Sequence, residues 1–246
     1  MVDRVFSEPS LAELYDRFCP WEERGDLSFY LSLVMSAETV LDVGCGTGQL
    51  LRRARQDGHT GRLCGLDPAD AMLDQARTRS DIEWILGDVT SVDWDHRFDL
   101  VVMTGHAFQV LIEDDQLRAS LAAIRSVLTD DGRFAFETRN PLVRTWESWI
   151  PENAVEVVGP AGVAVRMAHE VSAPINGQLV SFTTAFTGPG WDGPQVSRST
   201  LRFLDAASLS SFLSEAALEI DEQFGDWDRY PLTDTSPEII TIARRR

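Results

Sequence analysis

The sequence predicts an α/β fold, in which a mostly parallel β-sheet is covered by helices on both faces and a small antiparallel sheet is inserted late in the chain. Apolar runs of strand length alternate with amphipathic helical stretches over residues 39–138, as in a parallel sheet with crossover helices. A glycine-rich loop follows the first apolar run, at residues 44–48. Beyond residue 138 the segments are short, rich in β-branched residues and separated by glycine and proline, which is typical of antiparallel strands.

The first half of the chain is predicted element by element from this alternation. TVLDV at 39–43 is typical of a buried strand, and QLLRRARQDG at 49–58 places Leu50, Leu51 and Ala54 on one face of a helix. The pattern continues with a strand at 62–67, a helix at 70–79, strands at 82–88 and 98–103, a helix at 114–128, a turn at 130–132 and a strand at 133–138. Such sheets bind ligands beyond the carboxyl ends of their strands, which is where the glycine loop is expected to lie.

The second half is predicted to carry the insertion. Four antiparallel strands are expected at 154–158, 163–172, 178–187 and 197–205. A helix is expected at 206–218, and the segments 219–227 and 238–245 are expected to close the chain as a hairpin. The antiparallel sheet therefore lies between the fifth strand and the last helix.

Composition narrows the classes of function. The 246 residues suffice for one globular unit with an elaboration, and a formal net charge of −17 argues against nucleic acid and anionic membrane surfaces as partners. No lysine occurs, which excludes Schiff-base and P-loop lysine chemistry. Three widely spaced cysteines, no apolar secretory segment and no apolar run of about 18 residues predict a cytoplasmic protein that does not span a membrane.

The loop VLDVGCGTG, residues 40–48, carries the first functional motif. Its glycines are spaced Gly44-x-Gly46-x-Gly48 behind Asp42, whereas a dinucleotide fingerprint requires G-x-G-x-x-G. The stretch resembles motif I of the class I S-adenosylmethionine-dependent methyltransferases. The resemblance implies that the loop, with Cys45, wraps the amino acid and ribose parts of S-adenosylmethionine and that Asp42 helps to hold its ammonium. The alternative is a tight strand-to-helix turn without a ligand.

Later segments resemble further motifs of the same family in the same order. Asp67 lies 19 residues after Gly48, at the end of the second strand, where the family keeps an acid that accepts both ribose hydroxyls. The resemblance places further cofactor contacts at Pro68, Met72, Gly87, Asp88, Val89, Met103 and, in the N-terminal helices, Tyr15. Asp88 would face the adenine amino group, with a turn-forming acid as the alternative. For Met72 and Tyr15 the alternative is ordinary core packing.

The resemblance also implies a domain plan. The family fold is a Rossmann-like sheet of seven mostly parallel strands with helices on both faces. Residues 1–138 would supply N-terminal lid helices and the cofactor-binding part, residues 139–204 the antiparallel insertion, and residues 205–246 the last helix and closing hairpin. Small-molecule methyltransferases of this family use such an insertion as a substrate cover or as a dimer surface, so a homodimer is one expectation.

Residues for the methyl acceptor are predicted from position. His106 follows the fourth strand in VVMTGHAFQVL, at the ligand edge, and is the candidate general base, with a midpoint near the ordinary histidine pKa of about 6.5. The alternative is a histidine that only lines the pocket. Arg139, Trp146 and Trp149 are candidate acceptor contacts, although aromatic residues of an inserted sheet are as often its core.

The predicted function is therefore methyl transfer from S-adenosylmethionine, giving S-adenosylhomocysteine, to nitrogen or oxygen of a small-molecule metabolite. The four histidines, His59, His96, His106 and His169, are not spaced as a metal site. Two alternatives stay open at this stage: a non-catalytic cofactor-binding or scaffolding protein, and a nicotinamide-dependent dehydrogenase, which shares the strand-loop-helix start.

Overall fold

A computed structural model describes residues 2–95, 97–160, 162–172 and 177–246. Its larger sheet has seven strands in the order β10-β11-β5-β4-β1-β2-β3. The strands are β1 (Thr39–Val43), β2 (Arg62–Asp67), β3 (Glu83–Leu86), β4 (Phe98–Met103), β5 (Leu128–Arg139), β10 (Leu218–Phe224) and β11 (Glu238–Arg245). Strands β1 to β5 pair in parallel, and β11 is antiparallel to both of its neighbours. The predicted mostly parallel sheet and its closing hairpin are confirmed.

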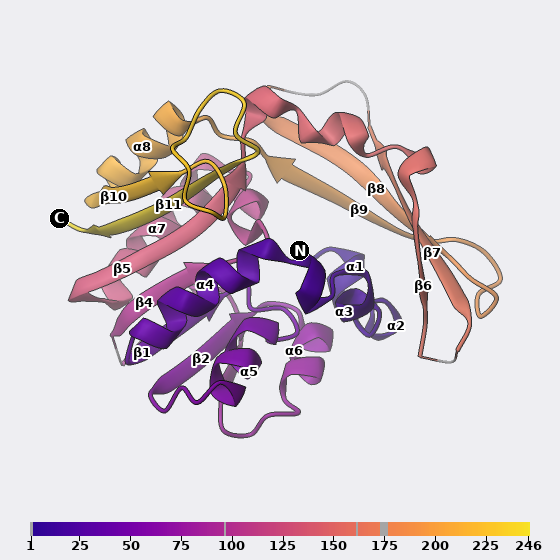
Figure 1. Ribbon diagram of the computed structural model, residues 1–246, viewed down its shortest axis with the longest axis horizontal. Helices are drawn as coiled ribbons and strands as arrows, with labels where there is room; N and C mark the ends of the chain where they lie inside the picture. The colour runs from indigo at the N-terminus through magenta and orange to yellow at the C-terminus, as the bar shows by residue number, and fades with distance from the viewer. Residues whose placement is uncertain (1, 96, 161, 173–176) are drawn as a thin grey trace.

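Helices cover both faces of this sheet (Figure 1). They are α4 (Gly25–Ser36), α5 (Gln49–Gln56), α6 (Asp70–Ala76), α7 (Asp114–Val127) and α8 (Ala206–Glu215). One hydrophobic core lies between α4, α5 and the strand residues Val40, Leu100 and Val102. Another lies between α7, α8 and residues such as Leu41 and Val101. Neighbouring residues of one strand thus enter opposite cores, because side chains alternate across a sheet.

The fifth strand begins earlier than predicted. β5 extends from Leu128 to Arg139, and its pairing with β4 shifts register between Phe98↔Leu128 and Leu100↔Arg133. The predicted turn at 130–132 is therefore an irregularity inside the strand. Leu128 and Phe98 are fully buried, so their pairing in the core decides where the strand starts.

The N-terminal segment forms short helices before α4. These are α1 (Arg4–Ser7), α2 (Pro9–Ala12), α3 (Tyr15–Phe18) and the 3-10 helix η1 (Trp21–Glu23). Leu11 and Leu14 pack against Val165 and Phe186 of the inserted sheet, while Ala12 packs against α6 through Met72. The short helices therefore contact both the inserted sheet and the larger sheet's helices.

The insertion is a separate antiparallel sheet of four strands, in the order β6-β7-β8-β9. They are β6 (Val155–Val158), β7 (Ala164–Val171), β8 (Leu179–Thr187) and β9 (Gln195–Arg202). Three 3-10 helices precede it: η3 (Pro141–Val143), η4 (Thr145–Ser148) and η5 (Pro151–Asn153). Figure 1 shows this sheet beside the larger one, with α1 to α3 at the corner between them. The predicted inserted sheet is confirmed.

Candidate active site

The loop between β1 and α5 adopts a left-handed backbone conformation at each of its glycines. Gly44, Gly46 and Gly48 have φ angles of 78°, 56° and 75°, a region that residues with a Cβ rarely adopt. At Gly48 a Cβ would also lie 2.4 Å from the Trp84 indole, so packing alone requires glycine there. At Gly46 a Cβ would meet only the end of the flexible Met72 side chain, at 3.2 Å. Gly46 lines a cavity, so its missing side chain leaves space for a ligand.

Asp42, in β1 just before this loop, has a buried carboxylate with an unpaired oxygen. The residue is 1% exposed, and its Oδ1 has no hydrogen-bond partner among the described residues. Burial, together with the charge of Asp67, raises the pKa of Asp42 to about 8. A buried polar atom without a partner destabilises the folded protein. The ammonium group of an amino-acid ligand would supply the missing donor.

Asp67, at the end of β2, fastens the glycine loop to the sheet. Its Oδ2 accepts a hydrogen bond from the Gly46 N–H at 2.8 Å, and its Oδ1 accepts one from the Ala69 N–H at 2.8 Å. Burial raises the pKa of Asp67, and these two backbone hydrogen bonds oppose the rise. Each carboxylate oxygen has a second lone pair. Asp67 can therefore hold the loop and still accept hydrogen bonds from a ribose diol.

Pro68 and Met72, two further predicted cofactor contacts, differ in exposure. Pro68 is exposed. Met72, on α6, is 2% exposed and packs with Ala12, Ala69 and Ala71. The structure thus shows the packing role for Met72, and its contact with adenine stays a prediction.

The segment after β3 forms a turn around Asp88. Asp88 is exposed, and its Oδ1 accepts hydrogen bonds from the Thr90 hydroxyl at 2.5 Å and the Thr90 N–H at 2.9 Å. The hydroxyl contact is the main cause that lowers the pKa of Asp88. Gly87 has a φ of 153° and Val89 is buried in the core. The turn-forming role of Asp88 is therefore visible, and its contact with adenine stays a prediction.

One cavity joins the predicted residues at the carboxyl edge of the sheet. From the predicted set it is lined by Tyr15, Asp42, Gly44, Cys45 and Gly46. The other lining residues were not identified from the sequence as cofactor contacts, and Arg24, Thr104 and Gly105 are among them. Met103 does not line it, because its side chain packs in the core.

Arg24 brings a positive charge to this cavity. Its guanidinium donates to both carboxylate oxygens of Asp26, at 3.1 Å from Nε to Oδ1. Gly105 makes room for it, since a Cβ there would lie 3.0 Å from the Arg24 Nη2. Arg24 and Asp42 thus place a guanidinium and a carboxyl group in one cavity, which suits the carboxylate and ammonium of an amino-acid group. In the sequence, Arg24 lies in the charged run WEERGD, which does not distinguish it from a solvated arginine.

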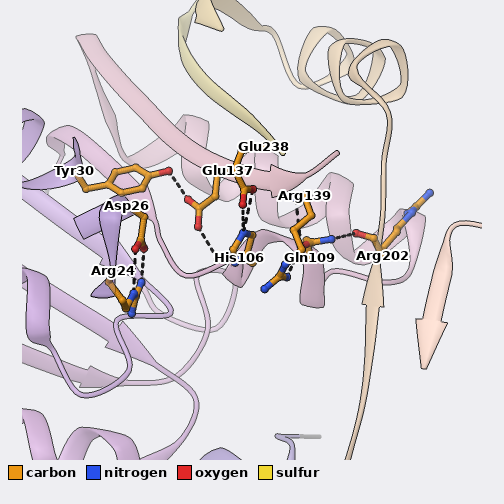
Figure 2. A network of polar contacts seen from close by, with 9 residues as sticks. All are labelled: Arg24, Asp26, Tyr30, His106, Gln109, Glu137, Arg139, Arg202 and Glu238. Atoms are coloured by element: carbon orange, nitrogen blue, oxygen red, sulfur yellow. Dashed lines mark hydrogen bonds and ion pairs between the residues drawn. The ribbon is translucent and has the colours of Figure 1, made fainter. Parts of the chain in front are cut away.

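A group of polar side chains, here called the acid cluster, lies where β4, β5 and β11 meet and consists of Tyr30, His106, Glu137 and Glu238 (Figure 2). Glu137, on β5, is fully buried. Tyr30 donates its hydroxyl to Glu137 Oε2, and the His106 N–H donates to Oε1 at 2.6 Å. Glu238 places its two oxygens 3.1 and 3.0 Å from His106 Nε2. Of this cluster, sequence reasoning identified only His106.

The electrostatics of the cluster favour a neutral imidazole. Burial lowers the pKa of His106, whereas burial raises the pKa of Glu238 to about 8. The expected midpoint near 6.5 therefore does not apply to this histidine. Nε2 faces Glu238, and Nδ1 has no hydrogen-bond partner among the described residues and is not one of the fully enclosed polar atoms. His106 is thus oriented by a carboxylate through one ring nitrogen and open at the other, as a base requires.

The three candidate acceptor residues from the sequence lie in two places. Trp146 packs against Phe203, with ring centres 4.6 Å apart, inside the core of the insertion. Trp149 packs on Phe182 at 4.7 Å and lies 5.4 Å from the Arg139 guanidinium carbon. Arg139 is next to the acid cluster (Figure 2). Trp146 therefore occupies a core position, and Trp149 and Arg139 lie together.

The remaining histidines make local contacts. His59 Nε2 lies 2.8 Å from the Ala37 carbonyl oxygen, and His169 Nδ1 lies 3.0 Å from the Thr184 hydroxyl. His96 lies outside the described residues. Within the described part of the chain, no group of three or more His, Cys, Asp or Glu side chains is arranged to hold a metal ion.

Comparison with known proteins agrees with this geometry. The chain is 28% identical over 217 residues to a protein from Geobacillus sp. (strain WCH70) that is assigned to the methyltransferases without a named substrate, covering 85% of each chain. It is 26% identical over 144 residues to a malonyl-[acyl-carrier protein] O-methyltransferase from Anoxybacillus flavithermus (strain DSM 21510 / WK1), covering 56% of this chain and 54% of that protein. The chain thus spans about half the length of this second relative.

A solved structure shares the whole fold. S-adenosylmethionine-bound CalS10, an amino pentose methyltransferase from Micromonospora echinaspora, superposes with a TM-score of 0.70 at 20% identity, covering 95% of this chain and 97% of CalS10. A family model described as a methyltransferase domain matches residues 40–132, the segment that holds the glycine loop, Asp67 and Asp88.

The chain belongs to the class I S-adenosylmethionine-dependent methyltransferases. The dehydrogenase and scaffold alternatives give way to this assignment, and S-adenosylmethionine is the methyl donor. Among the described residues of this methyltransferase, no helix has the length and apolar character to cross a membrane.

Proposed function

We propose that this methyltransferase moves the methyl group of S-adenosylmethionine to a nitrogen or oxygen atom of a small-molecule metabolite, with His106 as the base. The observation that carries the proposal is the contact of His106 Nε2 with both oxygens of Glu238, at 3.1 and 3.0 Å. His106 directly follows Gly105, which lines the cofactor cavity. The oriented ring therefore lies next to the place where the donor would bind.

The cofactor would be held by the residues of the family motifs. Asp42 would bind the ammonium group, Arg24 the carboxylate and Asp67 the ribose diol. The other proposed contacts are Tyr15, Gly44, Cys45, Gly46 and Gly48 around the amino acid and ribose, Pro68, Met72, Gly87, Asp88 and Val89 around the adenine, and Met103 beside the sheet edge. The unpartnered Asp42 Oδ1 and the position of Gly46 on the cavity wall support this placement.

The bound cofactor supplies a methyl group that is already activated for in-line displacement. The protein then has to orient the acceptor and remove its proton. His106 would accept that proton at Nδ1, and the proton already on Nε2 would pass to Glu238. Because burial raises the pKa of Glu238 to about 8, the pair can hold the proton more strongly than His106 could alone.

The inserted sheet lies beside this pair. Gln109, in the 3-10 helix η2 (Ala107–Val110) after β4, donates its Nε2 to the Arg202 carbonyl oxygen of β9 at 3.0 Å. The insertion therefore contacts the segment that directly follows His106. We propose that residues 139–204 act as a substrate cover between the parts 1–138 and 205–246. One relative is an O-methyltransferase, which supports oxygen as the acceptor atom, and nitrogen stays the alternative predicted from the sequence. Three free thiols support a cytoplasmic location.

Turnover of the wild type and two variants tests the base. With an acceptor found by screening metabolites for methyl uptake, His106→Asn and Glu238→Gln should each lower kcat by roughly 100-fold while the Kd for S-adenosylhomocysteine stays within about twofold. Turnover of the wild type should rise with pH through a midpoint near 8, because only ionised Glu238 can take the proton. The Glu238→Gln variant should lose this rise.

The matched control is His59→Asn, which removes a histidine whose ring contacts Ala37 away from the site. This variant should keep the wild-type kcat. An unchanged kcat in His106→Asn would rule His106 out as the base, and a change confined to the acceptor KM would leave it as a binding residue.

A further inference from the structure

Arg139 carries a charge that the protein itself does not neutralise by direct contact. Its guanidinium donates from Nη1 to the Gln109 side-chain oxygen at 2.9 Å. Among the described residues, no carboxylate oxygen forms an ion pair with it within 4.0 Å. The residue is only partly exposed, and burial lowers the pKa of Arg139. An enclosed arginine without an acid partner is unfavourable unless something else supplies the negative charge.

The surroundings hold this guanidinium in one place. Gln109 is itself anchored, because its Nε2 donates to the Arg202 carbonyl oxygen at 3.0 Å, which turns its side-chain oxygen toward Arg139 (Figure 2). On another side, the guanidinium carbon lies 5.4 Å from the centre of the Trp149 ring. None of the remaining side-chain N–H groups of Arg139 has a hydrogen bond within the described chain, and none is fully enclosed. They therefore face space that a ligand can reach.

The two acidic residues near Arg139, Glu137 and Glu238, already contact other residues through both carboxylate oxygens. Both oxygens of Glu137 accept hydrogen bonds, from Tyr30 and from the His106 N–H. Both oxygens of Glu238 lie against His106 Nε2. These carboxylates act on Arg139 through space but do not occupy its donors, so a two-oxygen anion could still bind the open side of the guanidinium.

We propose that Arg139 binds an acidic group of the methyl acceptor, either a carboxylate or a phosphate. His106 meanwhile accepts the proton from the atom that receives the methyl group. His106 is the N-cap of the 3-10 helix Ala107–Val110, and Gln109, the anchor of Arg139, lies within that helix. Both ends of a small molecule can therefore reach His106 and Arg139. The acceptor class is therefore a small amino or hydroxy acid or a phosphorylated amine. This inference rests on the proposed function, because it assumes that the acid cluster is the acceptor site.

Matched pairs of probes test the acidic group. The pairs are β-alanine with β-alaninamide, lactate with lactamide, and phosphoethanolamine with ethanolamine, and each is offered to the full chain saturated with S-adenosylhomocysteine. Calorimetry should show at least one acidic probe bound roughly 30-fold more tightly than its neutral partner, as expected for a charge-assisted contact. The first two pairs report a carboxylate, and the third reports a phosphate.

Variants locate the contact. Arg139→Gln should reduce the preference for the acidic probe to about onefold, and Arg139→Lys should keep part of it as a point charge. In both variants the Kd for S-adenosylhomocysteine should stay within about twofold of wild type, which shows that the fold survives. The control is Arg144→Gln, because Arg144 lies on the same segment but is exposed and pairs with Glu147 at 2.9 Å.

Two results would overturn the acidic subsite. One is wild-type protein that binds S-adenosylhomocysteine but shows no preference for any acidic probe. The other is a preference that Arg139→Gln retains. Failure of the proposed function has a different signature: the cofactor product and acidic probes bind as expected, but no amine or hydroxyl compound in a broad screen takes up a methyl group.

Discussion

The cofactor loop and the acid cluster share one edge of the sheet but are built in different ways. The loop is one continuous stretch, Asp42 to Gly48, and its properties come from backbone conformation and one adjacent carboxylate. The acid cluster takes single residues from α4, the loop after β4, β5 and β11, and Tyr30 and Glu137 are 107 positions apart. Its properties come from contacts across the fold.

This difference separates cofactor binding from turnover. Changes in the loop alter residues that line the cofactor cavity, so their main functional effect should be on cofactor affinity. Changes in the acid cluster remove partners from buried polar groups. They should alter stability and turnover while cofactor affinity stays near its original value.

The largest effect on cofactor binding is expected from Gly46→Val, a change in the glycine loop. The new side chain would occupy the ligand face and force a β-branched residue to a φ of 56°. We expect the Kd for S-adenosylhomocysteine to rise at least about 1000-fold by calorimetry, since both ligand space and backbone shape are lost. Gly58→Val is the control, because Gly58 has a φ of 97° with no atom within 4 Å of a Cβ. Equal losses of affinity in both variants would show that backbone strain, and not the loss of ligand space, causes the effect.

Asp42→Asn should weaken cofactor binding and stabilise the free protein. Loss of the charge opposite the ammonium should raise the Kd roughly 100-fold, as for a buried charge-assisted contact. In the ligand-free wild type, the raised pKa of about 8 means that Asp42 keeps a proton which the unfolded chain has released above about pH 4. Its contribution to stability therefore falls as pH rises from about 4 to 8, by a few kcal/mol at most.

Denaturant titrations of the ligand-free proteins at several pH values measure this contribution. Asp42→Asn should show the smaller decline in unfolding free energy and should be the more stable protein at pH 8. Parallel curves for the two proteins would show that Asp42 has no raised pKa.

Asp67→Ala should cost about 1.5–3 kcal/mol of cofactor binding, the range for hydrogen bonds to a charged group. The wild type should also bind a 2′-deoxy analogue less well than the natural cofactor product, and the variant should not distinguish them. Because Asp67 also holds the Gly46 and Ala69 N–H groups, the analogue separates the ribose contact from loop support. The same discrimination in both proteins would place the diol elsewhere.

The smallest effect is expected from Tyr30→Phe, a change in the acid cluster that should lower stability but not cofactor affinity. The variant removes the hydroxyl that donates to buried Glu137, so the unfolding free energy should fall by about 1–2 kcal/mol. The Kd for S-adenosylhomocysteine should not change. A loss of cofactor affinity as large as that of Asp67→Ala would show that the two regions are not separate.

Secondary structure was predictable where local pattern and tertiary contacts agree. The strands at 39–43, 62–67 and 98–103 have the predicted bounds, because continuous apolar runs are buried on both faces of a parallel sheet. The start of β5 was not predictable in this way. The DDG stretch has local turn character, but the pairing of Leu128 with Phe98 extends the strand through it. Burial of two apolar side chains outweighed the turn preference there.

The fold class and the position of the cofactor loop could be predicted from spacing within short segments, since Asp42 and the glycines lie within seven consecutive residues. The family could be predicted from the resemblance of these motifs. The tertiary structure alone brought Tyr30, Glu137 and Glu238 around His106, and left Arg139 without an acid partner. Each of these residues is, in the sequence, one ordinary polar side chain near a strand or helix. Their chemistry arises from burial and from partners that strand order supplies, and neither is encoded in any local pattern.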